Sequence, residues 1–260
     1  MLKARSKENL ISMLGLLGVI LLFTLALVAK PVQAGVLWDQ PLSVVNQSAY
    51  VNQNFPDFPA YSSFLADDFA NATPWNISKI FVPGDLWSGG TTLGNATYLN
   101  FAIYGNDAGI PAGYPGGGSG PQWNISLTPT DLQITISTGS PGGYLSNVTL
   151  NLATAVNLPV GEWWFIFYPV MDFTSSGQYG RQPSDTTNGN TGQFINPGGG
   201  FGYGTDWQPW TVLGATQSDI AFRMEGTTGQ APVPEPATML LLGSGLIGLA
   251  GYGRKKFFKK

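Results

Sequence analysis

Short runs in which apolar and polar residues alternate recur through the middle of this chain, and they constrain its fold more than any other feature. Apolar residues occupy every second position of segments 99–103, 132–136, 148–152 and 220–224. Successive side chains of a β-strand point to opposite faces of a sheet, so a period of two predicts half-buried strands. No interior window keeps the period of a helix. We therefore predict an all-β domain.

Trp163–Val170 is apolar on both faces, which predicts a central strand covered on both sides. Turns rich in glycine and proline separate the predicted strands, notably 105–121. Segment 174–206, which contains a triple glycine, is predicted to be a long irregular loop, and such loops are uncommon unless they are functional. We predict a single antiparallel β-sandwich, jelly-roll-like, that spans residues 35–229.

The charge of the chain is unevenly distributed. Charged residues make up only 10% of it, and most of the basic ones lie at the two ends. Between the ends, residues 35–229 include three basic and 13 acidic residues, a formal charge of −10. Such a surface repels phosphate, so we expect no nucleic-acid partner.

The chain has no cysteine and no histidine. Ser-His-Asp triads, cysteine nucleophiles and zinc sites with His or Cys ligands are therefore excluded. A glycoside hydrolase needs only two carboxylates about 5–10 Å apart, so this class of enzyme is not excluded. The sequence pairs no two acids in this way. We expect no catalytic residue, no cofactor and no enzyme activity.

The N-terminal residues 1–34 are predicted to be a signal peptide. Basic residues in segment 3–7 precede an apolar helix over 10–29, a Lys-Pro pair ends the helix, and small residues follow. We expect signal peptidase to cleave between Ala34 and Gly35. The alternative is an uncleaved anchor, because the apolar run is long enough to cross a bilayer.

The C-terminal residues 230–260 have three parts. A proline-rich linker is followed by an apolar stretch over 237–253, which as a helix would be about 25 Å long, enough for a short transmembrane helix. A basic tail, 254–260, comes directly after it. Because basic residues stay on the cytoplasmic side, we expect the β-domain to face outward.

The linker, helix and tail together resemble a PEP-CTERM sorting signal over about the last 27 residues. The residues that carry the resemblance are Pro234, Glu235, Pro236, Arg254, Lys255 and Lys256. The resemblance implies processing by the membrane transpeptidase exosortase, with cleavage near the Pro-Glu-Pro triplet and release or transfer to another anchor. An ordinary C-terminal anchor with a proline-rich stalk is the alternative. Segments 37–41, 66–69 and 219–223 are also loosely similar to a sandwich common among PEP-CTERM cargo, which supports the fold only.

Tryptophan is the most suggestive candidate for ligand binding in the exported part. Trp207 and Trp210, near Asp206 and the triple glycine, are the candidate glycan-binding residues, since aromatic faces stack on sugar rings. The alternative is that these rings cap the core, where tryptophan is usually placed. Asp67-Asp68 and Asn106-Asp107 carry oxygen ligands that suit calcium, but neither has a calcium-loop spacing, so we expect no metal.

Three functional hypotheses follow. The first is a structural protein of the cell surface or extracellular matrix that builds or decorates an exopolysaccharide or biofilm layer. The second is a carbohydrate-binding module, and the third is the carboxylate-pair hydrolase. The expected partners are signal peptidase and exosortase during maturation, the membrane before processing, and extracellular polysaccharide. The expected location is the cell envelope or the exterior, with transient anchoring by the C-terminal helix.

Overall fold

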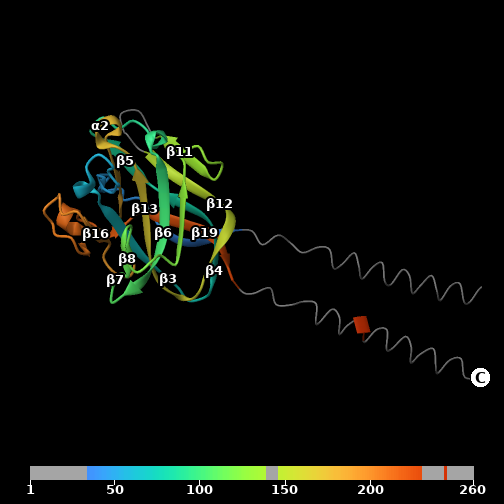
Figure 1. Cartoon of the computed structure of the whole chain (residues 1–260). Helices are drawn as coiled ribbons and strands as arrows, with labels where there is room; N and C mark the ends of the chain where they lie inside the picture. The colour runs from blue at the N-terminus through green and yellow to red at the C-terminus, as the bar shows by residue number, and fades with distance from the viewer. Residues whose placement is uncertain (1–33, 139–145, 230–242, 245–260) are drawn as a thin grey trace, which may run out of the picture. The chain divides into compact units, whose positions relative to one another are not determined.

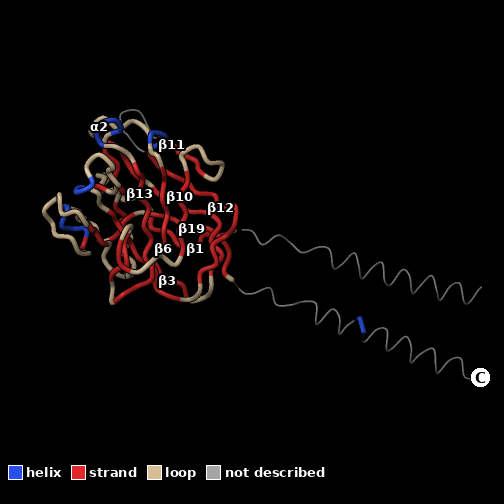
Figure 2. The backbone as a smooth tube through the Cα atoms, in the orientation of Figure 1, coloured by secondary structure: helices blue, strands red, loops and turns tan. Residues whose placement is uncertain are grey.

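The computed structural model of this chain describes residues 34–138, 146–229 and 243–244 (Figure 1). Strands make up 53% of it and helices 8%, which confirms the all-β prediction (Figure 2). Among the described residues, no helix has the length and hydrophobicity that crossing a membrane requires. The predicted signal peptide and nearly all of the predicted C-terminal helix lie outside the described residues. The three domain boundaries and the jelly-roll arrangement stay predictions.

Two antiparallel sheets enclose the main core. The first has the order β1-β19-β4-β12-β11, with β1 Gly35–Gln40, β19 Phe222–Thr228, β4 Trp75–Val82, β12 Ser146–Leu158 and β11 Ile134–Thr138. The second has the order β10-β6-β13-β3-β16-β17, with β10 Trp123–Leu127, β6 Tyr98–Asp107, β13 Gly161–Val170, β3 Phe64–Asn71, β16 Gln193–Ile195 and β17 Gln208–Pro209. One continuous cluster of buried side chains comes from both sheets, including Ile80, Leu150 and Phe222 from the first and Phe101 and Phe165 from the second.

Smaller elements complete the described part. They are β2 Tyr50–Val51, β5 Gly84–Trp87, β7 Ile110–Pro111, β8 Gly113–Tyr114, β9 Gly117–Gly118, β14 Gln178–Arg181, β15 Pro183–Ser184, β18 Asp219–Ile220, helix α2 Phe173–Ser176, and the 3-10 helices η1 Pro59–Tyr61, η2 Leu93–Asn95 and η3 Trp210–Leu213.

The long segment 174–206 is more ordered than predicted. It contains part of α2 and the strands β14, β15 and β16. These strands pair with distant parts of the chain, since β14 lies between β2 and β5, β15 pairs with β18, and β16 pairs with β3. Two- to four-residue strands with remote partners leave no alternating pattern in the local sequence, which is why the prediction of an irregular loop was wrong.

The second sheet is covered on both of its faces. Its outer face carries a separate buried cluster that includes Tyr104, Trp164, Ile166 and Ile195. Strand β13 lies between β6 and β3, so the prediction of a central strand is confirmed. The prediction that β6 is half-buried was wrong, because Ala102 and Tyr104 are buried on this outer face.

A wide bulge interrupts β12. Asn151 pairs with Lys79 of β4, and the next paired residue of β12 is Val156, opposite Ile77. Residues 152–155 therefore have no partner in β4 and form an irregular, bulged part of the strand. Strand β11 begins only at Ile134, so the predicted strand start at Leu132 was wrong, and that side chain is fully exposed.

Candidate functional site

A pocket lined mainly by aromatic rings opens beside α2, which Figure 1 labels. Its volume is about 310 Å³. The lining residues are Phe55, Phe58, Tyr61, Phe173, Gln178 and Phe201. They come from three separate parts of the chain, 55–61, 173–178 and 201, so the pocket exists only in the folded domain.

The rings of this aromatic pocket meet edge to face. The Phe58 and Phe173 ring centroids are 6.0 Å apart at an interplanar angle of 81°, and those of Tyr61 and Phe201 are 5.3 Å apart at 84°. Phe58 and Tyr61 are each 44% exposed, while Phe55 is buried. Edge-to-face packing holds the rings in place and leaves apolar surface accessible to a ligand.

Two hydrogen bonds connect the segment that contains Asp57 to α2, beside the pocket. The Asp57 carboxylate accepts hydrogen bonds from the backbone N–H groups of Phe173 and Thr174, both at 2.9 Å. Burial acts to raise the pKa of Asp57, but these N–H donors outweigh it and lower the pKa. The carboxylate therefore fixes the start of α2, and with it the Phe173 ring.

The triple glycine packs directly on η1, which carries Tyr61. A side chain at Gly198 would place its Cβ atom 2.5 Å from the Ala60 Cα atom, and one at Gly200 would place it 2.6 Å from the Ala60 carbonyl oxygen. Asn196 completes the junction, since its amide donates to the Ala60 carbonyl at 2.8 Å. Only glycine allows this close approach, so the glycine run positions Tyr61.

Gln178 is the polar member of the lining. Its side-chain amide makes no hydrogen bond to any other described residue, although it lines the pocket together with five aromatic rings. A free amide both donates and accepts, so it suits a ligand with hydroxyl groups. The aromatic pocket therefore combines an apolar surface with one polar group able to orient a ligand.

The predicted glycan-binding residues lie outside the aromatic pocket. Trp210 is fully buried, and its indole N–H donates to the Ser218 carbonyl at 2.8 Å, so the core alternative describes this ring. Trp207 is half-buried against the outer cluster of the second sheet, and Asp206 is exposed. A binding role for Trp207 and Asp206 stays a prediction. All eight tryptophans are buried or half-buried, and the exposed aromatic rings of the described residues belong to Phe and Tyr.

A buried polar network joins segments that the sequence resemblance had grouped. The Gln40 side-chain amide lies 3.0 Å from an Asp219 carboxylate oxygen and 3.3 Å from one of Asp67, and it donates to both. Asp67 also accepts the N–H groups of Asp68 and Ile220. The three segments of the loosely similar sandwich thus converge on one buried site.

Arg181 brings a positive charge to this network. It is fully buried, and its guanidinium carbon lies 5.3 Å from the Phe165 ring centroid and 5.8 Å from that of Phe222. Its Nη2 group donates to the Ala221 carbonyl at 3.1 Å. Burial lowers the pKa of Arg181 to about 10, so the guanidinium remains protonated at neutral pH.

The acids of the network are shifted in the opposite direction. Burial and the nearby Asp219 charge raise the pKa of Asp67 well above its ordinary value, despite the Ile220 N–H and the Arg181 charge. Burial also raises the pKa of Asp219 and of Asp68. Within the described residues, no three acidic side chains gather so that they could hold a metal ion. In this structure the hydrogen bonds of the network join the three segments that contain Gln40, Asp67 and Asp219.

The other candidate oxygen ligands serve local packing. The Asn106 side-chain oxygen accepts the indole N–H of Trp164 at 2.8 Å, and its amide donates to Glu162 at 2.8 Å. Asp68 accepts both the backbone N–H and the side-chain amide of Asn190.

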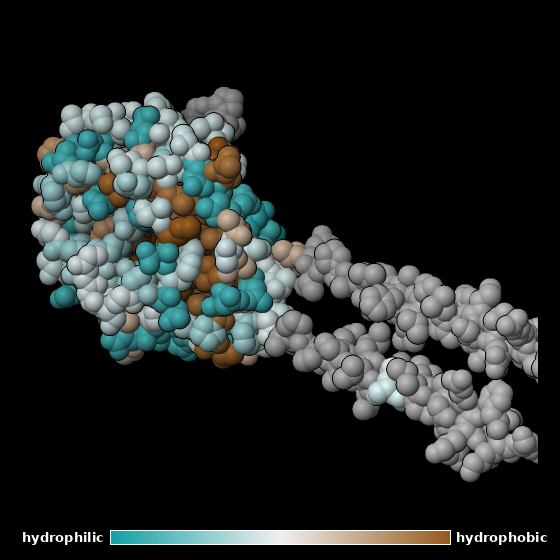
Figure 3. Space-filling model, turned by 45° about the vertical axis from the view of Figure 1, so that its right-hand side comes forward, coloured by the Kyte–Doolittle hydropathy of each residue, from teal (hydrophilic) through white to brown (hydrophobic). Residues whose placement is uncertain are grey.

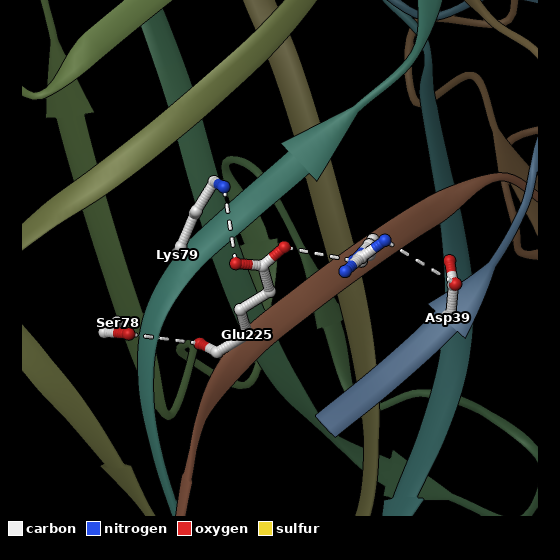
Figure 4. A network of polar contacts seen from close by, with 5 residues as sticks. Asp39, Ser78, Lys79 and Glu225 are labelled. Carbon is white, nitrogen blue, oxygen red and sulfur yellow. Dashed lines mark hydrogen bonds and ion pairs between the residues drawn. The ribbon is translucent and has the colours of Figure 1, made fainter. Parts of the chain in front are cut away.

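The surface of the first sheet carries an ion-pair network across three strands (Figure 4). Glu225 of β19 lies 3.3 Å from the Lys79 ammonium of β4 and 3.1 Å from the Arg223 guanidinium. Arg223 also lies 3.9 Å from Asp39 of β1. Asp39 and Glu225 border a cavity of about 340 Å³, and both take part in this ion-pair network.

The C-terminal segment of the chain indicates the class of protein. Residues 232–255 match the family model of the PEP-CTERM protein-sorting motif, which marks the chain as an exported protein that exosortase processes. The match contains Pro234, Glu235, Pro236, Arg254 and Lys255, all outside the described residues. No curated protein and no solved structure matches the chain. The roles of the individual sorting and cleavage residues, including Lys256, Ala34 and Gly35, stay predictions.

Proposed function

We propose that the exported domain is a non-catalytic component of the cell surface or extracellular matrix that binds polysaccharide through its aromatic pocket. The observation that carries this proposal is the set of accessible Phe and Tyr rings around a pocket with one free amide. The sorting motif supports placement outside the cell, with transient membrane anchoring and the basic tail in the cytoplasm. A jelly-roll arrangement of the sandwich is part of the same proposal.

Size and chemistry favour a sugar unit as the occupant. A volume of about 310 Å³ is at the lower end of small-molecule sites, so one or two sugar residues of a longer chain would fill the pocket. The C–H face of a pyranose packs on Phe58 or Tyr61, while the Gln178 amide binds hydroxyl groups. A polymer continues into solvent from the open side.

Two observations support binding over catalysis. The acids with raised pKa values in the Asp67 network are buried and line none of the pockets described here. The acids that border a cavity, Asp39 and Glu225, are ion-paired. The acids with raised pKa values and the acids that border a cavity are therefore separate sets, whereas a carboxylate-pair hydrolase needs both of its acids in one cleft.

Isothermal titration calorimetry of the full chain with the host's exopolysaccharide tests the proposal. We expect a saturable heat that Tyr61→Ala weakens by about tenfold, equivalent to about 1.4 kcal/mol. Tyr98→Ala is the matched control, because Tyr98 is 45% exposed but lies on β6, outside the pocket. No heat, or equal weakening by both variants, contradicts the proposal. Sustained heat in proportion to protein concentration indicates turnover instead.

A further inference from the structure

Strand β10 is an edge strand that pairs on one side only. It is the last strand of the second sheet, and its five residues pair with β6. Its other edge pairs with no strand in the described part of the chain. No residue of β10 is buried: Trp123, Ile125 and Leu127 are half-buried, and Asn124 and Ser126 are exposed. The unpaired backbone groups of this edge are available to another strand.

A groove with both apolar and polar lining residues runs beside β10, between strands of the two sheets. Its volume is about 460 Å³, and it lies between Trp123 and Ile125 of β10 and the bulged segment 152–157 of β12. The half-buried Leu127, Ile136 and Leu152 add apolar surface against the core. Figure 3, in which the side with β11 and β12 comes forward, shows a band of hydrophobic surface with hydrophilic residues on both sides.

The β10 edge lacks the features that usually protect an edge strand. Its sequence has no charged residue and no proline, and its register with β6 is continuous, without a bulge. Strand β1, at an edge of the first sheet, has two of these protective features, a register shift and the charged Asp39. Natural proteins use charges and bulges to prevent pairing between edges, so the β10 edge is open to pairing.

The distribution of charge selects a second copy of this chain as the partner. The domain has a formal charge of −10, so two copies repel each other over most of their surfaces. Segment 108–130, which includes β10, has no charged residue at all. Two such edges meet without repulsion, and an antiparallel pair of identical strands about a twofold axis is self-complementary.

We propose that two copies of this protein associate through β10, edge to edge and antiparallel, so that the second sheets form one continuous sheet. The backbone groups of both edges then find partners. In both copies the side chains of Trp123, Ile125 and Leu127 face the same side of the joined sheet, and the partner covers part of the groove. Asn124 and Ser126 lie on the opposite, polar side.

Sedimentation of the full chain in detergent over a range of concentrations tests this association. We expect a concentration-dependent dimer in which Asn124 lies opposite Ser126 of the second copy. We expect Ser126→Lys to raise the dissociation constant at least about tenfold, because the two added charges lie diagonally across the axis on the same face of the joined sheet and repel each other. Thr135→Lys is the matched control, since Thr135 is an exposed residue of β11, the edge strand opposite β1 in the first sheet. It adds the same charge and is expected to leave the dimer unchanged.

Several results would overturn the proposal. A monomer at every concentration does so, and so does an equal effect of Ser126→Lys and Thr135→Lys. Asn124→Lys serves as the second variant if Ser126→Lys fails to fold, as judged by circular dichroism. The chain has no native cysteine, so single-cysteine chains give an independent readout. We expect an equal mixture of Asn124→Cys and Ser126→Cys to form a disulfide dimer, and Thr135→Cys to form none.

Discussion

At the scale of single residues, the buried network around Asp67 has an unusual charge balance. Asp67, Asp68 and Asp219 lie within range of one another's charges, and Arg181 is the buried cation that faces them. Removing charged groups from water is costly, and one guanidinium does not compensate three carboxylates. Proton uptake by the acids relieves the repulsion, so the stability of the domain depends on pH.

The direction of this dependence follows from the raised pKa values of Asp67 and Asp219. An acid whose pKa is raised by folding stabilises the folded state fully below its unfolded pKa, about 3.9, and loses this contribution as pH rises through the folded pKa. We therefore expect the melting temperature to fall as the pH rises above about 4. Asp219→Asn should reduce the accompanying loss in the free energy of unfolding by about 1 kcal/mol, because it removes a charge beside Asp67.

The Asp219→Asn change preserves the local geometry. One Asp219 oxygen accepts hydrogen bonds from Gln40 and from the Asn188 N–H, while the other has no partner among the described residues. The asparagine oxygen keeps both bonds. Asp206→Asn, at an exposed acid, is the control and should leave the pH profile of thermal melting unchanged. A profile of Asp219→Asn identical to that of the wild type would show that the network does not set the pH dependence.

The sequence predicted only part of what these residues do. It grouped the segments around Gln40, Asp67 and Asp219 by resemblance, but it did not indicate that they meet, because the contacts span up to 179 positions along the chain. It also directed attention to tryptophan for ligand binding. The exposed rings of Phe58, Tyr61 and Phe173 form no local pattern, and the triple glycine beside Tyr61 was the one signal that pointed to this region.

At the scale of elements, alternation located the long strands well. The segments predicted around 99–104 and 147–152 fall within β6 and β12, and 163–170 falls within β13. Their side chains are buried against long neighbouring strands, so the order of apolar residues along the local sequence reflects which positions are buried. Short strands such as β14 and β16 were missed because their pairing depends on remote partners.

The junction of β19 and β4 allows a test at this scale. A Cβ atom on Gly226 would lie 2.1 Å from the Asn76 carbonyl oxygen, next to the register shift between the two strands. We expect Gly226→Ala to force the strands apart and to lower the free energy of unfolding in urea by about 1–3 kcal/mol. Gly105→Ala is the control, since a Cβ atom there meets nothing within 4 Å. Equal destabilisation by both variants would contradict the close approach.

At the scale of the whole molecule, the sorting motif predicts how the chain matures. Replacing Pro234, Glu235 and Pro236 together with alanine should prevent processing, because the match to the motif includes this triplet. We expect the uncleaved chain to accumulate in the membrane fraction of the host, whereas the wild-type chain appears in a shorter form on an immunoblot. Gln230→Ala, just before the matched segment, should mature normally. Normal maturation of the triple variant would favour the ordinary anchor with a proline-rich stalk.

The order of strands in the first sheet has a consequence for the timing of export. Strand β19, the last of the described domain, lies between β1, the first, and β4. A chain that crosses the membrane from its N-terminus delivers β19 after every other strand, and until then β1 has no neighbour to pair with. The native sheet therefore closes only when translocation of the domain is almost complete. A chain stalled partway across would leave β1 unpaired and open to proteases, so the fold itself distinguishes a fully delivered domain from an interrupted one.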